Sequence, residues 1–168
     1  MLLISDTNIL IDMSVAGLLE SMFGLPERFA VPDVLFVEEL GERHPELLTL
    51  GLVTLSLDGE GVMEAYRVRA DCTGRAAPSL NDLFALMLAR QVGGILLTGD
   101  RRLRELTESR YSEVGVRGTL WIVRRLMEHG LLEASAAREA YRRMKQSGSR
   151  LPWGEVNRQL VEWGVNPF

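Results

Sequence analysis

A chain of 168 residues with 46% hydrophobic and 25% charged residues is long enough to bury one sizeable core, and these fractions are ordinary for a globular protein. The single cysteine, Cys72, excludes an internal disulfide, and with two histidines it nearly excludes a zinc site of Cys and His ligands. No apolar run reaches the roughly 18 residues of a transmembrane helix, so we expect a cytoplasmic protein without a membrane partner.

The formal net charge of −4 conceals an uneven distribution along the chain. Residues 1–66 carry two basic and twelve acidic groups, whereas residues 67–168 carry 17 basic and 11 acidic groups. An acidic half that holds a metal, beside a basic half that meets phosphates, would suit a metal-dependent nuclease. An uneven spread of charges over solvated helix faces explains the same counts equally well.

The chain opens with a short apolar run that stops at Asp6, the pattern of a strand buried on both faces. A second run, residues 94–98, leads in the same way to Asp100. In an open parallel sheet, working residues lie just beyond the carboxyl ends of the strands. We therefore predict that these two strands bring Asp6 and Asp100 to one edge of the sheet, as in a carboxylate cluster that binds a divalent cation.

Strand and helix patterns alternate between and after these two runs. Ser79 is a good N-cap for a strongly apolar helix, and residues 72–78 before it are predicted to be a loop. The remaining strands are predicted at 28–31, 52–57 and 113–117, and the helices at about 8–23, 32–44, 59–70, 80–92 and 101–109. Beyond residue 118 the spacing predicts three more helices, at about 119–129, 133–147 and 153–163.

This order predicts an α/β fold, a three-layer αβα arrangement with a central parallel sheet and a helical C-terminal tail. We expect residues 1–168 to form a single domain. Its core would span about residues 1–130, and residues of about 131–168 would form a helical C-terminal extension.

Four acidic positions stand at places where such a sheet would gather them: Asp6, Glu38 or Glu39, Asp82 and Asp100. Mg²⁺ and Mn²⁺ prefer oxygen ligands, and carboxylates that share a cation repel one another without it, so at least one should have a raised pKa. Each residue also has a purely structural explanation. The aspartates suit helix caps, helix N-termini or turns, and the glutamates suit a solvated helix face.

The residues around these acids carry a resemblance. The segment Asp-Thr-Asn-Ile-Leu-Ile-Asp at 6–12, the Val-Pro pair at 31–32 followed by Glu38, Leu-Asn-Asp at 80–82, and residues 96–103 look like the four motifs of PIN-domain proteins. The sequence most closely resembles the VapC-like toxin branch of that family. The resemblance covers roughly residues 1–130, and a likeness over residues 118–131 extends it toward the tail.

This resemblance implies a PIN fold and a ribonuclease that depends on Mg²⁺ or Mn²⁺. Carried over by position, the acidic quartet would be Asp6, Glu38, Asp82 and Asp100, as catalytic and metal-binding residues. Thr98 would orient water or Asp100, and Asn8 would support Asp6. A toxin of this kind also implies RNA as the substrate, an antitoxin protein as a possible partner and a possible homodimer.

The second motif leaves a choice between two neighbouring glutamates. Counting from Pro32 favours Glu38, whereas the aliphatic residue that the family places after its glutamate favours Glu39, which precedes Leu40. We assign Glu38.

Three arginines, Arg101, Arg102 and Arg104, follow Asp100 and are candidates for binding the RNA backbone. An exposed basic helix face is an equally good explanation of their spacing. The alternative to an enzyme is a non-catalytic PIN-like module that binds RNA or protein. The presence of all four acids favours the enzyme.

Overall fold

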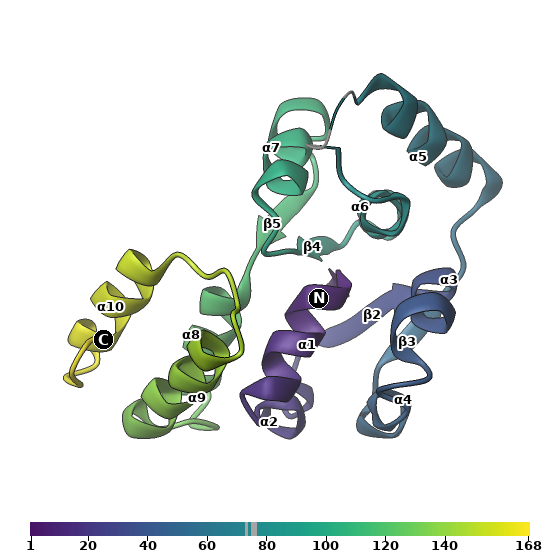
Figure 1. Ribbon diagram of the computed structural model, residues 1–168. Coiled ribbons are helices and arrows are strands. Elements are labelled where there is room, and N and C mark those ends of the chain that lie inside the picture. The colour runs from purple at the N-terminus through teal and green to yellow at the C-terminus, as the bar shows by residue number, and fades with distance from the viewer. Residues whose placement is uncertain (73, 75–76) are drawn as a thin grey trace.

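The fold is a five-stranded, all-parallel sheet flanked by helices on both faces, and the predicted α/β class is confirmed (Figure 1). The computed structural model describes residues 1–72, 74 and 77–168. The strands run in the order β3-β2-β1-β4-β5. Their bounds are β1 (Leu2–Ser5), β2 (Arg28–Pro32), β3 (Val53–Leu55), β4 (Ile95–Leu97) and β5 (Gly115–Arg117).

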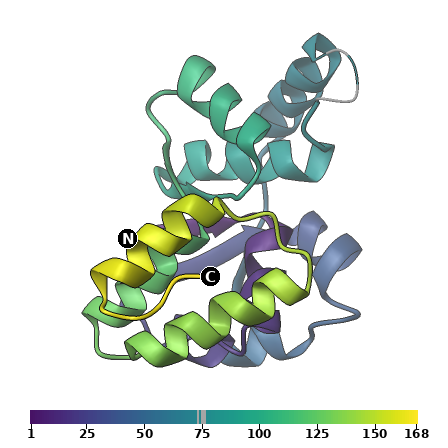
Figure 2. The same ribbon diagram turned by 60° about the vertical axis from the view of Figure 1, so that its left-hand side comes forward.

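Two groups of helices enclose the sheet. On one face α6 packs against β1, β2 and β4, and α5 packs against α6. On the other face α1 contacts α2, α8 and α9 (Figures 1 and 2). The helices are α1 (Thr7–Val15), α2 (Leu19–Phe23), α3 (Asp33–Leu35), the π-helix η1 (Phe36–Leu40), α4 (Glu46–Leu50), α5 (Gly59–Asp71), α6 (Leu80–Val92), α7 (Arg101–Arg110), α8 (Thr119–Glu128), α9 (Ala134–Gln146) and α10 (Trp153–Glu162).

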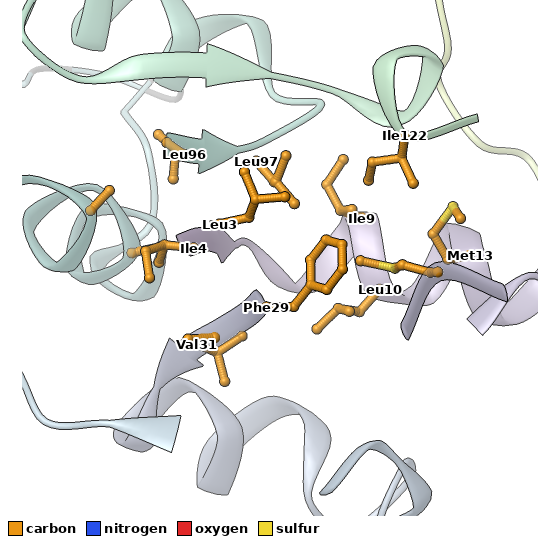
Figure 3. Close-up of a cluster of buried hydrophobic side chains, with 14 of the residues drawn as sticks. Leu3, Ile4, Ile9, Leu10, Met13, Phe29, Val31, Leu96, Leu97 and Ile122 are labelled. Carbon is orange, nitrogen blue, oxygen red and sulfur yellow. The ribbon is translucent and has the colours of Figure 1, made fainter. Parts of the chain in front are cut away.

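The core is built around the central strand β1, which has neighbours on both edges and on both faces. Leu3 and Ile4 have no exposed surface, because β2, β4 and the helices on each face cover them. Figure 3 shows the side chains that surround this strand: Ile9, Leu10 and Met13 of α1, Phe29 and Val31 of β2, Leu96 and Leu97 of β4, and Ile122 of α8.

The strand order creates a switch point between β1 and β4. The chain moves outward from β1 to β2 and β3, and then returns to place β4 and β5 on the other side of β1. Ser5 pairs with Leu97, so the two strands end level with each other. In open parallel sheets the crevice at such a point, outside the carboxyl ends, is the usual place for a site.

Two of the predicted helices differ from the structure. The helix expected over residues 8–23 is two helices, because Gly17 adopts a φ of +71° that favours glycine and ends α1. The helix expected from Pro32 is a short α3 followed by the π-helix, and Pro32 itself ends β2. Helix α4 was not predicted. Of the predicted loop at 72–78, residues 73, 75 and 76 lie outside the described residues.

The C-terminal helices pack on the helical layer that contains α1 (Figure 2). Tyr141 of α9 and Leu160 of α10 are fully buried. The loop between α9 and α10 contacts α1 directly, because the Ser149 hydroxyl donates a hydrogen bond of 2.6 Å to Oδ1 of Asp12. In the described part of the chain, no helix is long and apolar enough to cross a membrane.

We predict that the tail unfolds together with the rest of the chain. Leu160→Ala should lower the free energy of unfolding by about 2–4 kcal/mol, because it leaves a cavity in a fully buried position. Chemical denaturation followed by far-UV and near-UV circular dichroism should show one transition in both parent and variant. Val161→Ala is the matched control, because the neighbouring Val161 is 59% exposed and its truncation should cost little. Two separate transitions would contradict the single-domain prediction.

Candidate functional site

Asp6 lies at the junction of β1 and α1 and is 1% exposed. Its backbone N–H donates to the carbonyl oxygen of Leu97, which continues the β1–β4 pairing by one more hydrogen bond of 2.9 Å. Its Oδ1 accepts from the N–H of Ile9 at 3.0 Å, and its Oδ2 accepts from the hydroxyl of Thr98 at 2.5 Å. The carboxylate is therefore held by one group from its own helix and one group from the neighbouring strand end.

Thr98 connects Asp6 to Asp100. While its hydroxyl donates to Asp6, the same oxygen accepts a hydrogen bond of 3.0 Å from the backbone N–H of Asp100. Asp100 in turn caps α7, and its Oδ1 accepts from the N–H groups of Arg102 and Leu103 at 2.7 and 3.2 Å. The structure therefore brings the two predicted strand-end aspartates together through one buried threonine.

Asp82 reaches the same edge from α6. It is the N3 residue of a capping box, in which its N–H donates to the Ser79 hydroxyl at 3.1 Å and its Oδ2 accepts from the Ser79 N–H at 3.3 Å. All three aspartates thus cap helix N-termini, as expected if their roles were purely structural. The same caps place the three carboxylates near one another, so capping and a shared site are compatible.

Electrostatics show that these carboxylates are close enough to affect one another. Burial is the main cause that raises the pKa of Asp6 to about 7, and the negative charges of Asp82 and Asp100 raise it further. The pKa of Asp82 is raised first by burial and then by the charges of Asp100 and Glu39. Glu39 is therefore the fourth carboxylate that acts on this cluster, which we call the acidic edge: Asp6, Glu39, Asp82 and Asp100.

The two neighbouring glutamates of η1 face different surroundings. Glu39 accepts a hydrogen bond of 2.5 Å from the hydroxyl of Thr7, the residue after Asp6. Glu38 accepts one of 2.9 Å from the side-chain amide of Asn81 and lines a separate cavity. The geometry thus favours Glu39 over Glu38, the residue assigned from the spacing to Pro32. Thr7, which sequence reasoning missed, holds Glu39 in this position.

The acidic edge has the chemistry of a divalent-cation site. Its four carboxylates supply the oxygen ligands that Mg²⁺ and Mn²⁺ prefer, and a cation would offset both the burial and the repulsion that raise the pKa values of Asp6 and Asp82. Among the described residues, no group of three or more Asp, Glu, His or Cys side chains is arranged to hold a metal ion as it stands. Mg²⁺ usually retains several waters and needs few direct protein ligands, so the donor set fits it.

The other predicted site residues lie around this edge. Asn8 is exposed in the first turn of α1, while the hydrogen bonds to Asp6 come from Ile9 and Thr98. Arg101 is strongly exposed and forms an ion pair of 2.7 Å with Glu105 on the same helix.

The remaining two arginines differ in exposure. Arg102 is exposed, and its backbone N–H donates to Asp100. Arg104 is half-buried, and its guanidinium lies beside Gly118 at the end of β5. All three basic side chains therefore start from α7, whose N-cap is Asp100.

Comparison with known proteins agrees with this architecture. A family model described as a PIN domain matches residues 2–164, which include the five strands and the C-terminal helices. No curated protein and no solved structure gave a significant match. Because the family model covers almost the whole chain, this protein belongs to the PIN-domain family.

Proposed function

We propose that this protein is an endoribonuclease that uses Mg²⁺ or Mn²⁺ to hydrolyse RNA phosphodiester bonds at the acidic edge. PIN domains are generally nucleases and usually need divalent metal ions, so membership of the family indicates a nuclease-type module. The observation that carries the proposal is the buried Asp6 carboxyl, whose pKa is raised to about 7 by burial and by two neighbouring carboxylates. Such strongly perturbed groups in a crevice are typical of functional sites.

The surrounding residues would hold the carboxylates in place during catalysis. Thr98 fixes both Asp6 and the backbone of Asp100, and Thr7 fixes Glu39, so the donors need little reorganisation. A bound divalent cation supplies Lewis-acid chemistry, which stabilises the charge that builds up on phosphate oxygens. The arginines of α7, Arg101, Arg102 and Arg104, stand beside Asp100 and are the nearest candidates for contacting the RNA backbone.

A narrower role as the toxin of a toxin–antitoxin pair rests on the motif resemblance to the VapC-like branch. It would add an antitoxin protein as a partner and a location in the cytoplasm. The alternative is a non-catalytic module that binds RNA or protein. Activity and metal affinity separate these possibilities, because a binding module needs neither.

We predict that Asp100→Asn lowers metal-dependent RNA cleavage at least about 100-fold while the fold persists. Asparagine also caps helices well, so α7 should keep its N-terminus when the charge is removed. Structured and unstructured RNAs would be incubated with parent and variant in Mg²⁺, in Mn²⁺ and in chelator. The variant, purified identically, also controls for contaminating nucleases. Equal cleavage by parent and variant would refute the proposed site.

The choice between the two glutamates is testable with a matched pair of variants. Glu39→Gln should weaken Mn²⁺ binding at least about tenfold, because it removes one of the charges at the acidic edge. Glu38→Gln should change the affinity less than about twofold, because its carboxylate bonds to Asn81 instead. Isothermal titration calorimetry would measure both. The opposite order of effects would restore Glu38 as the metal ligand.

Asp6 should make the metal-free protein less stable as the pH rises. Its pKa is about 7 in the folded state and near the ordinary 3.8 in the unfolded chain, so its contribution is most favourable below pH 3.8 and is lost as the pH rises toward 7. Asp6→Asn removes this ionisation. In chelator, the variant should gain stability relative to the parent by about 2–3 kcal/mol between about pH 5 and about pH 8.

Urea denaturation of parent and Asp6→Asn across this pH range would measure that gain. Adding Mg²⁺ near pH 8 should stabilise the parent and leave the variant unchanged, because only the parent keeps the buried charge that the cation neutralises. A stability difference that does not depend on pH would show that Asp6 does not ionise in this range.

A further inference from the structure

A cavity of about 400 Å³ is lined by residues of α3 and η1 on one side and of α5 and the start of α6 on the other. This volume lies within the range of sites that bind small molecules, about 300–1,000 Å³. The apolar and aromatic lining on α5 and α6 includes Tyr66, Leu80 and Phe84. The polar lining comes from three elements, with Asp33 on α3, Glu38 on η1 and Asn81 at the start of α6.

The cavity and the acidic edge draw residues from the same two segments of the chain. Asn81 lines the cavity, and the next residue, Asp82, belongs to the acidic edge. Glu38 lines the cavity, and the next residue, Glu39, also belongs to the acidic edge. The hydrogen bond from Asn81 to Glu38 joins these two segments at the boundary. The cavity and the acidic edge are thus built from consecutive residues of η1 and of α6, and one hydrogen bond joins the two segments.

The apolar wall suits a flat aromatic ligand. The residue Tyr66 is 55% exposed although it lines the cavity, so its side chain is accessible to a ligand. The buried Phe84 supports it in an edge-to-face contact, with ring centroids 6.3 Å apart and an interplanar angle of 72°. An aromatic ring held in this way is the usual platform on which proteins stack unpaired bases of single-stranded RNA.

The charges of the cavity favour a base over a phosphate. Its two acidic lining residues, among those described, are Asp33 and Glu38, and no basic residue lines it. Carboxylates repel phosphate but accept hydrogen bonds from exocyclic amines, as they do from the N4 amine of cytosine. Adenine, cytosine and guanine carry such an amine, whereas uracil presents carbonyl oxygens in its place.

We propose that this cavity binds one base of single-stranded RNA, adjacent to the phosphate that is cut, and that it prefers bases with an exocyclic amine to uracil. The proposal rests on the proposed function, because it takes RNA as the ligand of the acidic edge. It assigns Tyr66 as the stacking residue, and Glu38 and Asp33 as the acceptors that distinguish the bases.

The first test measures binding without cleavage. Protein with labelled Val, Leu and Met methyl groups would be titrated in chelator with the trinucleotides AAA, CCC and UUU and followed by NMR. Val62 and Leu80 line the cavity and should shift with AAA and CCC, and more weakly with UUU. Met63 is an internal control, because it is exposed on α5 but does not line the cavity.

Variants of the stacking residue make this test specific. Tyr66→Ala should weaken trinucleotide binding about tenfold, and Tyr66→Phe should retain it, because stacking uses the ring rather than the hydroxyl. Met63→Ala, which removes an equally exposed apolar side chain from the same helix, should bind like the parent. Absence of shifts at the cavity methyls, or identical titrations for Tyr66→Ala and the parent, would overturn the proposal.

The second test uses cleavage. In an RNA that the parent cuts, a single abasic nucleotide would be moved through the positions around the cut. One position should slow the parent about tenfold, and the same substitution should have little further effect on Tyr66→Ala, because the stacking partner is already gone. Equal sensitivity of parent and Tyr66→Ala at every position would also refute base binding in this cavity.

These results separate failure of this proposal from failure of the proposed function. Trinucleotide binding at the cavity without cleavage of any RNA would leave the base site standing and refute the nuclease. Normal cleavage by Tyr66→Ala would support the nuclease and refute the base site. The cavity methyl signals could instead shift with protein concentration in the absence of RNA, and stop doing so in Tyr66→Ala. That result would identify the cavity as a contact surface for a second copy of the chain and would overturn base binding.

Discussion

The parallel pairing of β1 with β4 is the constraint on which the rest of this structure depends. It makes the first strand of the chain the centre of the sheet, and it sets the ends of the two strands level with each other. The bond from Thr98 to Asp6 extends that pairing from backbone to side chain, between residues 92 positions apart. Without it, the carboxylates of Asp6 and Asp100 would belong to unrelated turns. With this strand pairing, the two carboxylates lie close enough for the charge of Asp100 to raise the pKa of the buried Asp6.

The same residues both hold the fold and form the proposed site. Asp6 and Asp100 each satisfy backbone N–H groups at the start of a helix, and Asp82 closes a capping box. A helix N-terminus also favours negative charge, so the caps offset part of the cost of grouping acids together. The proposed base site would use the same two segments, because Glu38 and Asn81, which precede Glu39 and Asp82 in sequence, line the cavity.

Much of this arrangement could be predicted from the sequence, because apolar runs that end in aspartate specify both a buried strand and the place where it stops. The N-cap role of Ser79 was equally predictable, since it depends only on the residues that follow it in the chain. The choice between Glu38 and Glu39 could not be predicted. It depends on the rotation per residue in the π-helix, and the local sequence does not indicate that this segment is a π-helix. Thr7 was missed, and Thr98 was linked to Asp100 but not to Asp6, for a related reason. The hydrogen-bond partner of each threonine hydroxyl lies in a distant segment, so it is known only once the fold is known.

The strand order also has a consequence for folding during synthesis on the ribosome. The central strand is the first to be made, yet one of its two edges stays open until the chain has been extended to β4. Pairing across so many intervening residues is slow, because the chain entropy of closing a long loop must be overcome first. The two halves of the acidic edge therefore meet late, and a nascent chain that has not yet reached Thr98 contains most of the acids without the arrangement that joins them.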